Sequence, residues 1–513
     1  MAAKLFAAID VGSYELTMKI YEIKKGSIEE IDCVRRRISL GSDSYNTGRI
    51  GNEKLNALCE TLSDFARIMQ GYKVDAYKAY GTSAIREIEN TDVVLDQVKI
   101  RTGIDISVIS NSEQRFLDYK ALASKPAEFS RYIEGEGDSA LLDIGGGSVQ
   151  ISLFENDTLV ATQNMHLGVM IMRERLEALS AKSGTYERLI EESVNTQFSL
   201  FRKFYLKDAD VKNLVLIDDY LSPVLGRREF FKTPGVIDRD EFFSFMTELS
   251  KMHVFDISRK YSLSEEHASL LFYSAVLTDR ILEVFGSQKI WCPGVSLCEG
   301  IAFEYAQSVK LAGDAHDFEK DILASTLTIS KRFMCSRKRN EFLEALSLTI
   351  FDKMKKLHGL SKRERLLLQI AVQLNDCGKY ISQTEVGECS FRIIMATEII
   401  GLSHREREIV AFIAKYNRDE FDYNRLMYGQ ERVGRDEYLT IAKLTAILRV
   451  ANGLDRSHKQ KFRDYKVMLK DNELIISVDT KEDITLEEGL LTERKDFFEE
   501  VYNVRPVIKQ KRQ

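Results

Sequence analysis

Proline and tryptophan are scarce in this chain, which has five prolines and one tryptophan in 513 residues. Hydrophobic residues make up 44% and charged residues 30% of the chain, a composition that is ordinary for a soluble globular protein. The seven cysteines are odd in number and lack paired metal-ligand spacing, which argues against a disulfide framework. We therefore expect reduced core thiols in a cytoplasm.

Long hydrophobic runs and an excess of positive charge are also missing. No apolar run approaches the length that spans a bilayer, and the start "MAAKLFAAIDVGS" lacks the cleavage region of a signal peptide. The net charge of −6 gives no general attraction to nucleic acid. The sequence therefore predicts a cytoplasmic protein without a membrane or nucleic-acid partner, and its length predicts roughly three or four domains.

Glycine, by contrast, is concentrated in the stretch "SALLDIGGGSVQISLF" at residues 139–154. An apolar run reaches Asp143, meets three glycines at 145–147, and continues after Ser148 as an alternating strand. Glycines in a strand usually mark a bulge or a tight turn, so a plain hairpin is one interpretation. The other is a phosphate-binding turn, because bare N–H groups can cradle phosphate oxygens and a nearby carboxylate can hold a metal or a water. This segment alone leaves both interpretations open.

An internal repeat favours the phosphate interpretation over a duplication without a ligand. The segment "KLFAAIDVGSYELTMKIYEI" at 4–23 has the same order of strand, Asp-x-Gly turn and strand, with its turn at residues 10–13. Helical periodicity follows each copy, at 52–70 and 170–182. Strands that alternate with helices predict mixed α/β lobes, and we expect the two turns to face one another across a cleft.

Several motifs stand in the order seen in one protein family. They are Asp10-Val11-Gly12-Ser13, "GTSAIRE" at 81–87, "VISNSEQ" at 108–114, "LLDIGGGS" at 141–148 and "PGVSLCEG" at 293–300. In this order they resemble the Ppx/GppA phosphatases, which comprise exopolyphosphatases and guanosine pentaphosphate phosphohydrolases. The resemblance implies a two-lobed fold like that of actin, sugar kinases and heat-shock ATPases. The segments at 366–382, 401–418 and 444–458 are similar to the helical, HD-like domain of the long family members.

The resemblance also implies a reaction and a site. Water would attack the terminal phosphate of a linear phosphoanhydride in line, with Mg²⁺ as the divalent cation. Asp143 would anchor the metal or the water, and Arg86 would add a charged contact to the phosphate. The implied phosphate-binding residues are Asp10, Gly12, Ser13, Thr82, Ser83, Gly145, Gly146, Gly147 and Ser148.

The sequence departs from the family pattern at the positions of the catalytic and metal-binding carboxylates. The catalytic carboxylate falls on Gln114, and a metal-site glutamate falls on Gln150. An amide cannot take a proton from water, and loss of a general base costs about 10²–10⁴-fold in rate. Glu113 would replace the lost acid only if the helix start were shifted by one residue. The turn that completes the phosphate cradle appears as "LIDDY" at 216–220, where two carboxylates would repel a polyanion.

The HD-like segment lacks its metal ligands as well. At the matching positions stand Arg339, Asn375, Asp376, Cys389, Asn417 and Asn452. Only Asp376 is a ligand of the usual kind, and one carboxylate does not make a metal site. We expect a helical scaffold that holds no stoichiometric metal.

We expect four parts along the chain. Residues 1–125 and 126–312 form two ATPase-like α/β lobes, 313–460 an all-helical HD-like domain, and 461–513 a small α+β domain. The last part combines a hairpin with an Asp-Asn turn, a helix and a closing strand.

Two functions of different class agree with these motifs. The first is a hydrolase that releases the terminal phosphate of inorganic polyphosphate or guanosine pentaphosphate, weakened by Gln114 and Gln150. The alternative is a non-catalytic sensor that binds polyphosphate or guanosine polyphosphates and signals through its helical domain. The predicted partners are these phosphate compounds and a second copy of the chain in a homodimer.

Overall fold

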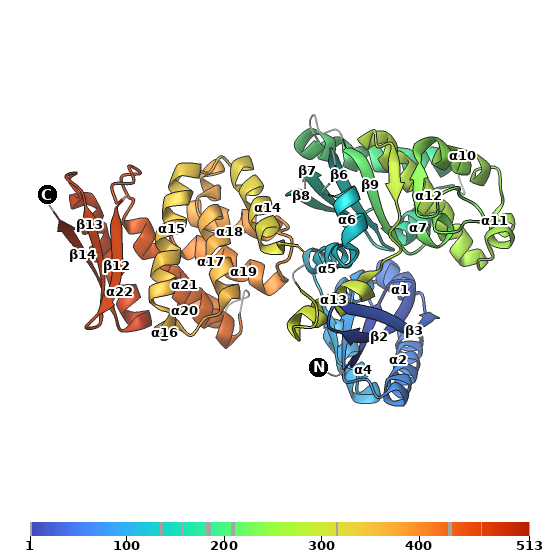
Figure 1. Cartoon of the computed structure of the whole chain (residues 1–513), viewed down its shortest axis with the longest axis horizontal. Coiled ribbons are helices and arrows are strands. Elements are labelled where there is room, and N and C mark those ends of the chain that lie inside the picture. Colours follow the sequence, from blue (N-terminus) through green and yellow to red (C-terminus); the bar gives the residue numbers. More distant parts are fainter. Residues whose placement is uncertain are drawn as a thin grey trace. The chain divides into compact units, whose positions relative to one another are not determined.

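A computed structural model describes residues 3–511 apart from 134, 136, 156–157, 181–185, 207–210, 314–315, 429–432 and 463. The chain divides into two compact units, Met1–Phe318 and Glu319–Gln513 (Figure 1). Across these described residues, no helix is long and apolar enough to cross a membrane. The predicted division into four parts stays a prediction.

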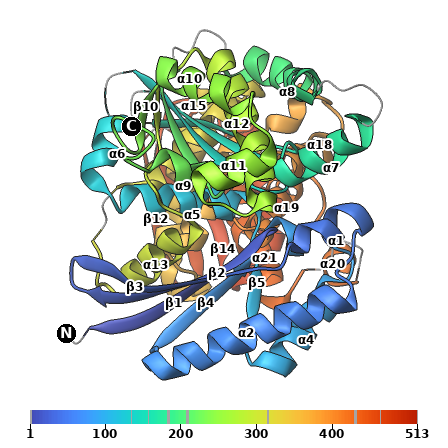
Figure 2. The ribbon, with the colours of Figure 1, turned by 90° about the vertical axis from the view of Figure 1, so that its right-hand side faces the viewer.

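The first lobe is built around a five-stranded sheet in the order β3-β2-β1-β4-β5. Its elements are β1 (Lys4–Val11), β2 (Glu15–Lys24), β3 (Ser27–Arg37), α1 (Leu40–Thr47), α2 (Asn52–Tyr72), β4 (Ala76–Gly81), α3 (Ser83–Arg86), α4 (Thr91–Thr102), β5 (Ile106–Val108) and α5 (Asn111–Ala123). Strand β1 is an almost continuous apolar run because both of its faces are buried. Ala7 and Ile9 face a core with α2 and α4, whereas Phe6 and Ala8 face α13 (Leu297–Ser308) on the other side of the sheet (Figure 2).

The second lobe repeats this strand order. Its sheet runs β10-β11-β9-β6-β7-β8, so β8-β7-β6-β9-β11 corresponds to β3-β2-β1-β4-β5, and β10 is added at the edge. Its elements are α6 (Pro126–Tyr132), β6 (Asp138–Ile144), β7 (Val149–Glu155), β8 (Thr158–Met165), α7 (Val169–Ser180), α8 (Tyr186–Phe201), the π-helix η1 (Arg202–Leu206), β9 (Val211–Asp218), α9 (Ser222–Leu225), β10 (Val236–Asp238), α10 (Arg239–Leu249), α11 (Val254–Tyr261), α12 (Glu265–Phe285) and β11 (Lys289–Trp291). In both lobes the first two strands pair antiparallel, and the first and fourth pair parallel. The repeat in the sequence is therefore a repeat of the fold.

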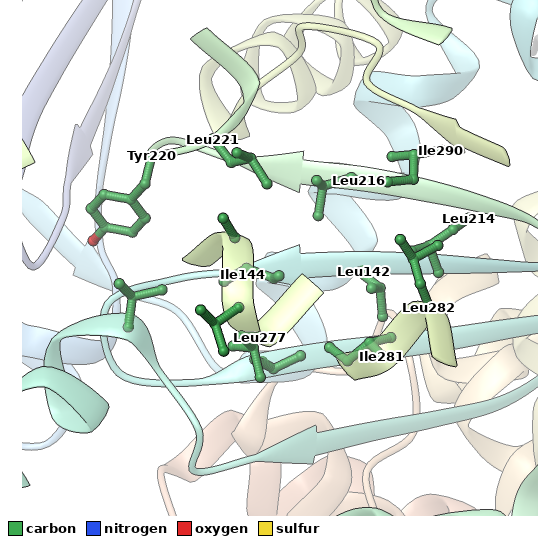
Figure 3. Close-up of a cluster of buried hydrophobic side chains, with 14 of the residues drawn as sticks. Leu142, Ile144, Leu214, Leu216, Tyr220, Leu221, Leu277, Ile281, Leu282 and Ile290 are labelled. Carbon is green, nitrogen blue, oxygen red and sulfur yellow. The ribbon is translucent and has the colours of Figure 1, made fainter. Parts of the chain in front are cut away.

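The core of the second lobe lies between its sheet and α12 (Figure 3). The cluster drawn there includes Leu142, Ile144, Leu214, Leu216, Leu277, Ile281, Leu282 and Ile290. The alternate residues of β6 point to the opposite face of the sheet, since successive side chains of a strand alternate. Asp143 is therefore held rigidly, with its backbone fixed by this core and its carboxyl on the face toward α5.

Helices α5 and α13 cross closely and join the lobes. A Cβ at Gly300 would lie 2.0 Å from the Leu117 carbonyl oxygen, so only glycine permits this approach. Both helices begin with a capping box, Ser110 with Glu113 and Ser296 with Glu299. Although α13 follows the second sheet in the sequence, it packs on the first one.

The second unit is helical and ends in a small α+β part. Its elements are α14 (Phe318–Arg332), α15 (Arg337–Lys353), α16 (Lys355–His358), α17 (Lys362–Leu374), the 3-10 helix η2 (Cys377–Tyr380), α18 (Val386–Ala396), α19 (His404–Tyr416), α20 (Tyr423–Tyr428), α21 (Arg435–Gly453), β12 (Tyr465–Lys470), β13 (Glu473–Asp479), α22 (Thr485–Tyr502) and β14 (Arg505–Lys511). The hairpin between β12 and β13 turns at Asp471 and Asn472, which both have positive φ, as a two-residue hairpin turn requires. The predicted fold class, two α/β lobes followed by helices and a small α+β unit, is confirmed.

Candidate functional site

The two Asp-Gly turns meet at a cavity between the lobes of the first unit. The cavity has a volume of about 70 Å³. The residues that line it are Asp10, Gly12, Ser13, Tyr14, Glu15, Thr17, Thr82, Ser83, Gln114, Asp143, Gly145, Gly146, Ser148, Gln150, Asp219, Tyr220 and His267.

The two turns have the same geometry. The N–H of Gly12 donates to the Glu15 carbonyl at 3.2 Å, and the N–H of Gly145 donates to the Ser148 carbonyl at 2.9 Å. Each aspartate lies two residues before its glycine and has a polar partner on the neighbouring strand, Thr17 for Asp10 and Gln150 for Asp143. Because the two glycine N–H groups close the turns themselves, donors to a ligand must come from the turn tips and from neighbouring hydroxyls.

The glycines of the second turn are explained by the first lobe. A Cβ at Gly146 would lie 3.0 Å from Ser13 Cβ, and one at Gly147 would lie 2.4 Å from the hydroxyl of Tyr45. Neither glycine has positive φ, so the lack of a side chain serves close approach rather than an unusual backbone conformation. Ser13 and Tyr45 of the facing lobe approach this turn, as do Met170 and Tyr220 of its own lobe.

Three hydroxyl groups converge beside the turns. Ser13 Oγ lies 2.6 Å from Tyr45 Oη and 3.1 Å from Ser83 Oγ, and the last two atoms are 2.9 Å apart. Burial raises the pKa of Tyr45 to about 12, so its hydroxyl stays a donor at neutral pH. Ser13 and Ser83 were predicted for this site, whereas Tyr45 carried no recognisable signal in the sequence.

Gln114 reaches across from α5 to the second lobe. Its Nε2 donates to Asp143 Oδ2 at 3.0 Å, which brings the two positions expected to handle the attacking water into direct contact. One helical turn later stands Asp118, which is also buried; burial and the neighbouring Asp143 raise the pKa of Asp118 well above its usual value. The sequence analysis missed Asp118, although its i, i+4 spacing from Gln114 places both on one helix face.

Negative charge dominates the cavity. Four of its lining residues are acids, Asp10, Glu15, Asp143 and Asp219, and none of the described residues that line it is a lysine or an arginine. Burial and the charge of Asp219 raise the pKa of Asp143 to about 7. Burial and the charges of Asp219 and Asp143 raise the pKa of Asp10 well above its usual value. These acids cannot all be ionised unless a cation neutralises them.

Three of the predicted site residues do not line the cavity: Gly147, Glu113 and Arg86. The Glu113 carboxylate accepts the Ser110 N–H at 2.8 Å in the capping box, a signature that was readable from the sequence. Arg86 donates to the Ile109 carbonyl at 2.7 Å and to the side chain of Asn111. Neither residue lines the cavity. Arg86 instead fixes the loop before α5, and so the start of the helix that carries Gln114.

The "LIDDY" turn presents one carboxylate to the cavity rather than two. Asp218 is buried and accepts the N–H groups of Tyr220 and Leu221 at 2.6 and 2.9 Å, so it caps its own turn. Asp219 lines the cavity. The ring of Tyr220 at the edge of the core (Figure 3) lies 6.0 Å from that of Tyr14, and the His267 ring nitrogen contacts the Tyr220 carbonyl at 3.1 Å. Aromatic rings from both lobes therefore fill this side of the cavity.

The oxygen atoms of this cavity could hold Mg²⁺ only together with oxygens from a bound phosphate or from water. Across the described part of the chain, no three His, Cys, Asp or Glu side chains are grouped closely enough to hold a metal by themselves. Mg²⁺ commonly binds through one or two carboxylates, waters and substrate phosphates. Asp10 Oδ1 and Gln150 Oε1 are buried and have no hydrogen-bond partner, so oxygen ligands without another use stand at the right place.

In the second unit, the positions compared with HD ligands form a buried polar network around an arginine. Arg339 donates to Asp376 at 2.5 Å, lies 3.3 Å from Asp455, and donates to Asn452. Asn452 in turn donates to Asn417 at 3.0 Å. Cys389 is half-buried on α18. A permanent guanidinium charge thus stands among these side chains, where a metal ion would need to be.

Comparisons with known proteins agree with this architecture. The chain is 20% identical over 481 residues to the guanosine-5'-triphosphate,3'-diphosphate pyrophosphatase of Vibrio atlanticus, with 92% of each chain covered. It is 21% identical over 456 residues to the protein of that name from Aeromonas hydrophila, and this match covers 87% of this chain and 86% of the relative.

Solved structures share the fold. The crystal structure of an exopolyphosphatase from Cytophaga hutchinsonii has a TM-score of 0.52 at 18% identity, covering 60% of this chain and all of that one. The Ppx/GppA family member from Aquifex aeolicus has a TM-score of 0.50 at 19% identity, covering 60% and 99%. Residues 19–309 match the model of the Ppx/GppA phosphatase family, and residues 323–497 match Ppx/GppA phosphatase, domain III. The chain belongs to the Ppx/GppA phosphatase family.

Proposed function

We propose that this protein releases the terminal phosphate of a linear phosphoanhydride, inorganic polyphosphate or guanosine pentaphosphate, with weakened catalysis. The observation that carries the proposal is the small cavity between two matched Asp-Gly turns, with hydroxyl donors on one side and Gln114 on Asp143 at the other. Asp10, Asp143 and Gln150 would hold Mg²⁺, which would neutralise the anionic substrate when bound.

The hydroxyl, amide and carboxyl groups of the site would have different roles in the reaction. The hydroxyls of Ser13 and Ser83 line the cavity and contact the hydroxyl of Tyr45 beside it, and they can donate to phosphoryl oxygens, which stabilises the charge of the transferred group. The Gln114 amide can hydrogen bond to the attacking water but cannot accept its proton. The proton must then leave through another acceptor, and Asp143, which Gln114 contacts, has a pKa of about 7 that suits proton transfer near neutral pH.

A non-catalytic sensor of polyphosphate or guanosine polyphosphates is the second candidate. The contact between Gln114 Nε2 and Asp143 Oδ2 favours it, because the amide occupies one carboxylate oxygen and cannot itself accept a proton from water. Binding would then rest on the hydroxyls and a cation alone.

Phosphate release from long-chain polyphosphate and from guanosine pentaphosphate, with purified full-length chain and Mg²⁺, distinguishes the two. We expect slow release that requires Mg²⁺ and is lost in Asp143→Asn. The matched control is Asp96→Asn, which removes an exposed acid on α4 of the first lobe and should keep the parent rate. Tight binding of either compound with no release would favour the sensor. Release that survives Asp143→Asn would place the chemistry elsewhere.

A further inference from the structure

Three consecutive arginines end β3, the edge strand of the first sheet (Figure 2). Arg35, Arg36 and Arg37 are all exposed, and because side chains alternate along a strand, the first and the last of them share one face. In the register with β2, Arg35 pairs with Thr17, and Arg37 pairs with Glu15. Thr17 and Glu15 both line the cavity. Paired residues present their side chains on the same face of a sheet, so Arg35 and Arg37 stand on the cavity face.

Two contacts place these guanidinium groups at the edge of the cavity. Arg35 Nη1 lies 3.4 Å from Glu15 Oε1, and the guanidinium carbon of Arg37 lies 5.8 Å from the centre of the Tyr14 ring. Glu15 and Tyr14 line the cavity, whereas no lysine or arginine does so among the described residues. The cavity therefore has acids inside and a pair of permanent cations beside it.

Backbone hydrogen bonds hold the end of β3 in this place. The N–H of Ser39 donates to the Tyr14 carbonyl at 2.9 Å, and the N–H of Gly41 donates to the Ser13 carbonyl at 2.8 Å. The chain after β3 thus wraps around the first Asp-Gly turn. Because these bonds use no arginine side chain, the arginines can be replaced without moving the strand.

The arginines are also free to serve a ligand. The Arg35 side chain is 46% exposed, and an exposed ion pair with one contact of 3.4 Å contributes little to stability. Exchanging Glu15 for a phosphate oxygen would therefore cost Arg35 little. A guanidinium group stays charged and presents a fork of N–H donors that matches phosphate. Arg35 and Arg37 lie about 7 Å apart along the strand, so they can contact different phosphate groups of one chain.

We propose that Arg35 and Arg37 form a second anion subsite, which binds the phosphate groups that follow the terminal one in a phosphoanhydride chain. The acids that line the cavity repel such a chain, and this pair supplies the positive charge that holds it where it leaves the cavity. This inference rests on the proposed function, because it needs the terminal phosphate in the cavity.

The test measures binding of a methylene-bridged, non-hydrolysable analogue of tripolyphosphate to the full-length chain with Mg²⁺, by calorimetry. We expect the Arg35→Gln, Arg37→Gln double variant to bind the analogue at least about tenfold more weakly than the parent. Orthophosphate, which fills the cavity alone, should bind both proteins equally. The matched control is Arg36→Gln, which removes the same charge from the other face of β3 and should bind the analogue like the parent.

A lysine variant separates charge from folding. Arg35→Lys, Arg37→Lys keeps both charges and should bind the analogue more tightly than the glutamine double variant does. Equal loss in the lysine and glutamine variants, equal loss of orthophosphate, or equal loss in Arg36→Gln would overturn the subsite. Unchanged analogue affinity with a lower melting temperature would also overturn it, because the arginines would then serve only to pair with the acids beside them.

Turnover separates this inference from the proposed function. A parent that binds the analogue through Arg35 and Arg37 but releases no phosphate would support the subsite while hydrolysis fails. A parent that hydrolyses polyphosphate with the same KM in the glutamine double variant would overturn the subsite and leave hydrolysis standing. A parent that binds neither the analogue nor orthophosphate would overturn both.

Discussion

Replacing Gln114 by glutamate should convert a passive contact into a cation-dependent catalytic group. In the parent, Gln114 Nε2 donates to Asp143 Oδ2 at 3.0 Å. Glutamate has nearly the same shape, so the substitution places a second carboxylate at that distance without changing the packing. Two unit charges about 3 Å apart repel by roughly 5 kcal/mol at an effective dielectric constant of about 20, which corresponds to roughly four pKa units.

The size of this repulsion sets the expected behaviour. Without a cation the Gln114→Glu, Asp143 pair should keep a proton at neutral pH, and the variant should be no more active than the parent. With Mg²⁺ both carboxylates can ionise, and a correctly placed base raises the rate by up to about 10²–10⁴-fold. Activity of the variant should therefore rise with pH, since the base works only after it loses its proton.

Gln150→Glu should further raise the rate of phosphate release, and its effect should depend on the glutamate at position 114. The extra charge strengthens binding of the cation that the new base at 114 requires, so the two changes are coupled. We expect the Gln114→Glu, Gln150→Glu double variant to release phosphate faster than either single variant or the parent. The acid at Asp219 and the aromatic side of the cavity limit the gain, so a modest increase is the expected size.

The assay is phosphate release from long-chain polyphosphate over a series of Mg²⁺ concentrations and pH values. Gln369→Glu is the matched control, because Gln369 also donates to a carboxylate from a helix, that of Glu344 at 2.7 Å, but in the second unit. It should leave the rate unchanged. Brisk turnover by the parent that Gln114→Ala does not alter would refute the assignment, since another acid would then do the work.

Three more predictions concern single groups. Arg339→Met should destabilise the second unit by about 3–5 kcal/mol in urea unfolding, because it leaves Asp376 and Asp455 buried without their cation. An unchanged unfolding midpoint would contradict this role of Arg339. A tightly bound transition metal that is lost in Asp376→Ala would also contradict it. Burial alone would raise the pKa of Asp376, but Arg339 and its neighbouring cations outweigh burial and lower it to about 2 from its usual 3.8. The folded-state pKa is the lower one, so this group should stabilise the fold by about 2 kcal/mol above pH 4 and lose that contribution as the pH falls toward 2, measured by unfolding at each pH. Tyr45→Phe removes one hydroxyl of the cluster and should weaken orthophosphate binding by about three- to tenfold in calorimetry, whereas equal affinity would remove Tyr45 from the site.

Much of the fold was readable from the sequence because its signals are local. The alternation of apolar residues and the Asp-x-Gly spacing placed two strand–turn–strand copies in matching positions, and the sheets repeat one strand order. The Asp-Asn pair near the C-terminus predicted a hairpin, and its two residues adopt the positive φ that such a turn needs. These features depend on residues within a few positions of one another.

The composition of the site depended on contacts between segments that are distant in the sequence. Arg86 and Glu113 stand inside family motifs, yet each is used within its own lobe to fix the loop and helix start that carry Gln114. Tyr45 and Asp118 stand in no such motif, yet the closing of the lobes brings one against Gly147 and the other against Asp143. A motif describes residues of one segment only. The partner of a buried charge or hydroxyl often comes from another segment, so a motif does not predict it.

Local sequence patterns were sufficient to predict two matched α/β lobes, their Asp-Gly turns, a helical region with Asp376 as its one remaining acid, and a C-terminal α+β part. The packing of the elements was needed to see that α13 returns to the first sheet, that Asp219 rather than Asp218 enters the cavity, and that Arg339 supplies the cation among the HD-like positions. The physical reason is that backbone geometry follows local side-chain pattern, while charge neutralisation and close packing are settled only when the elements meet.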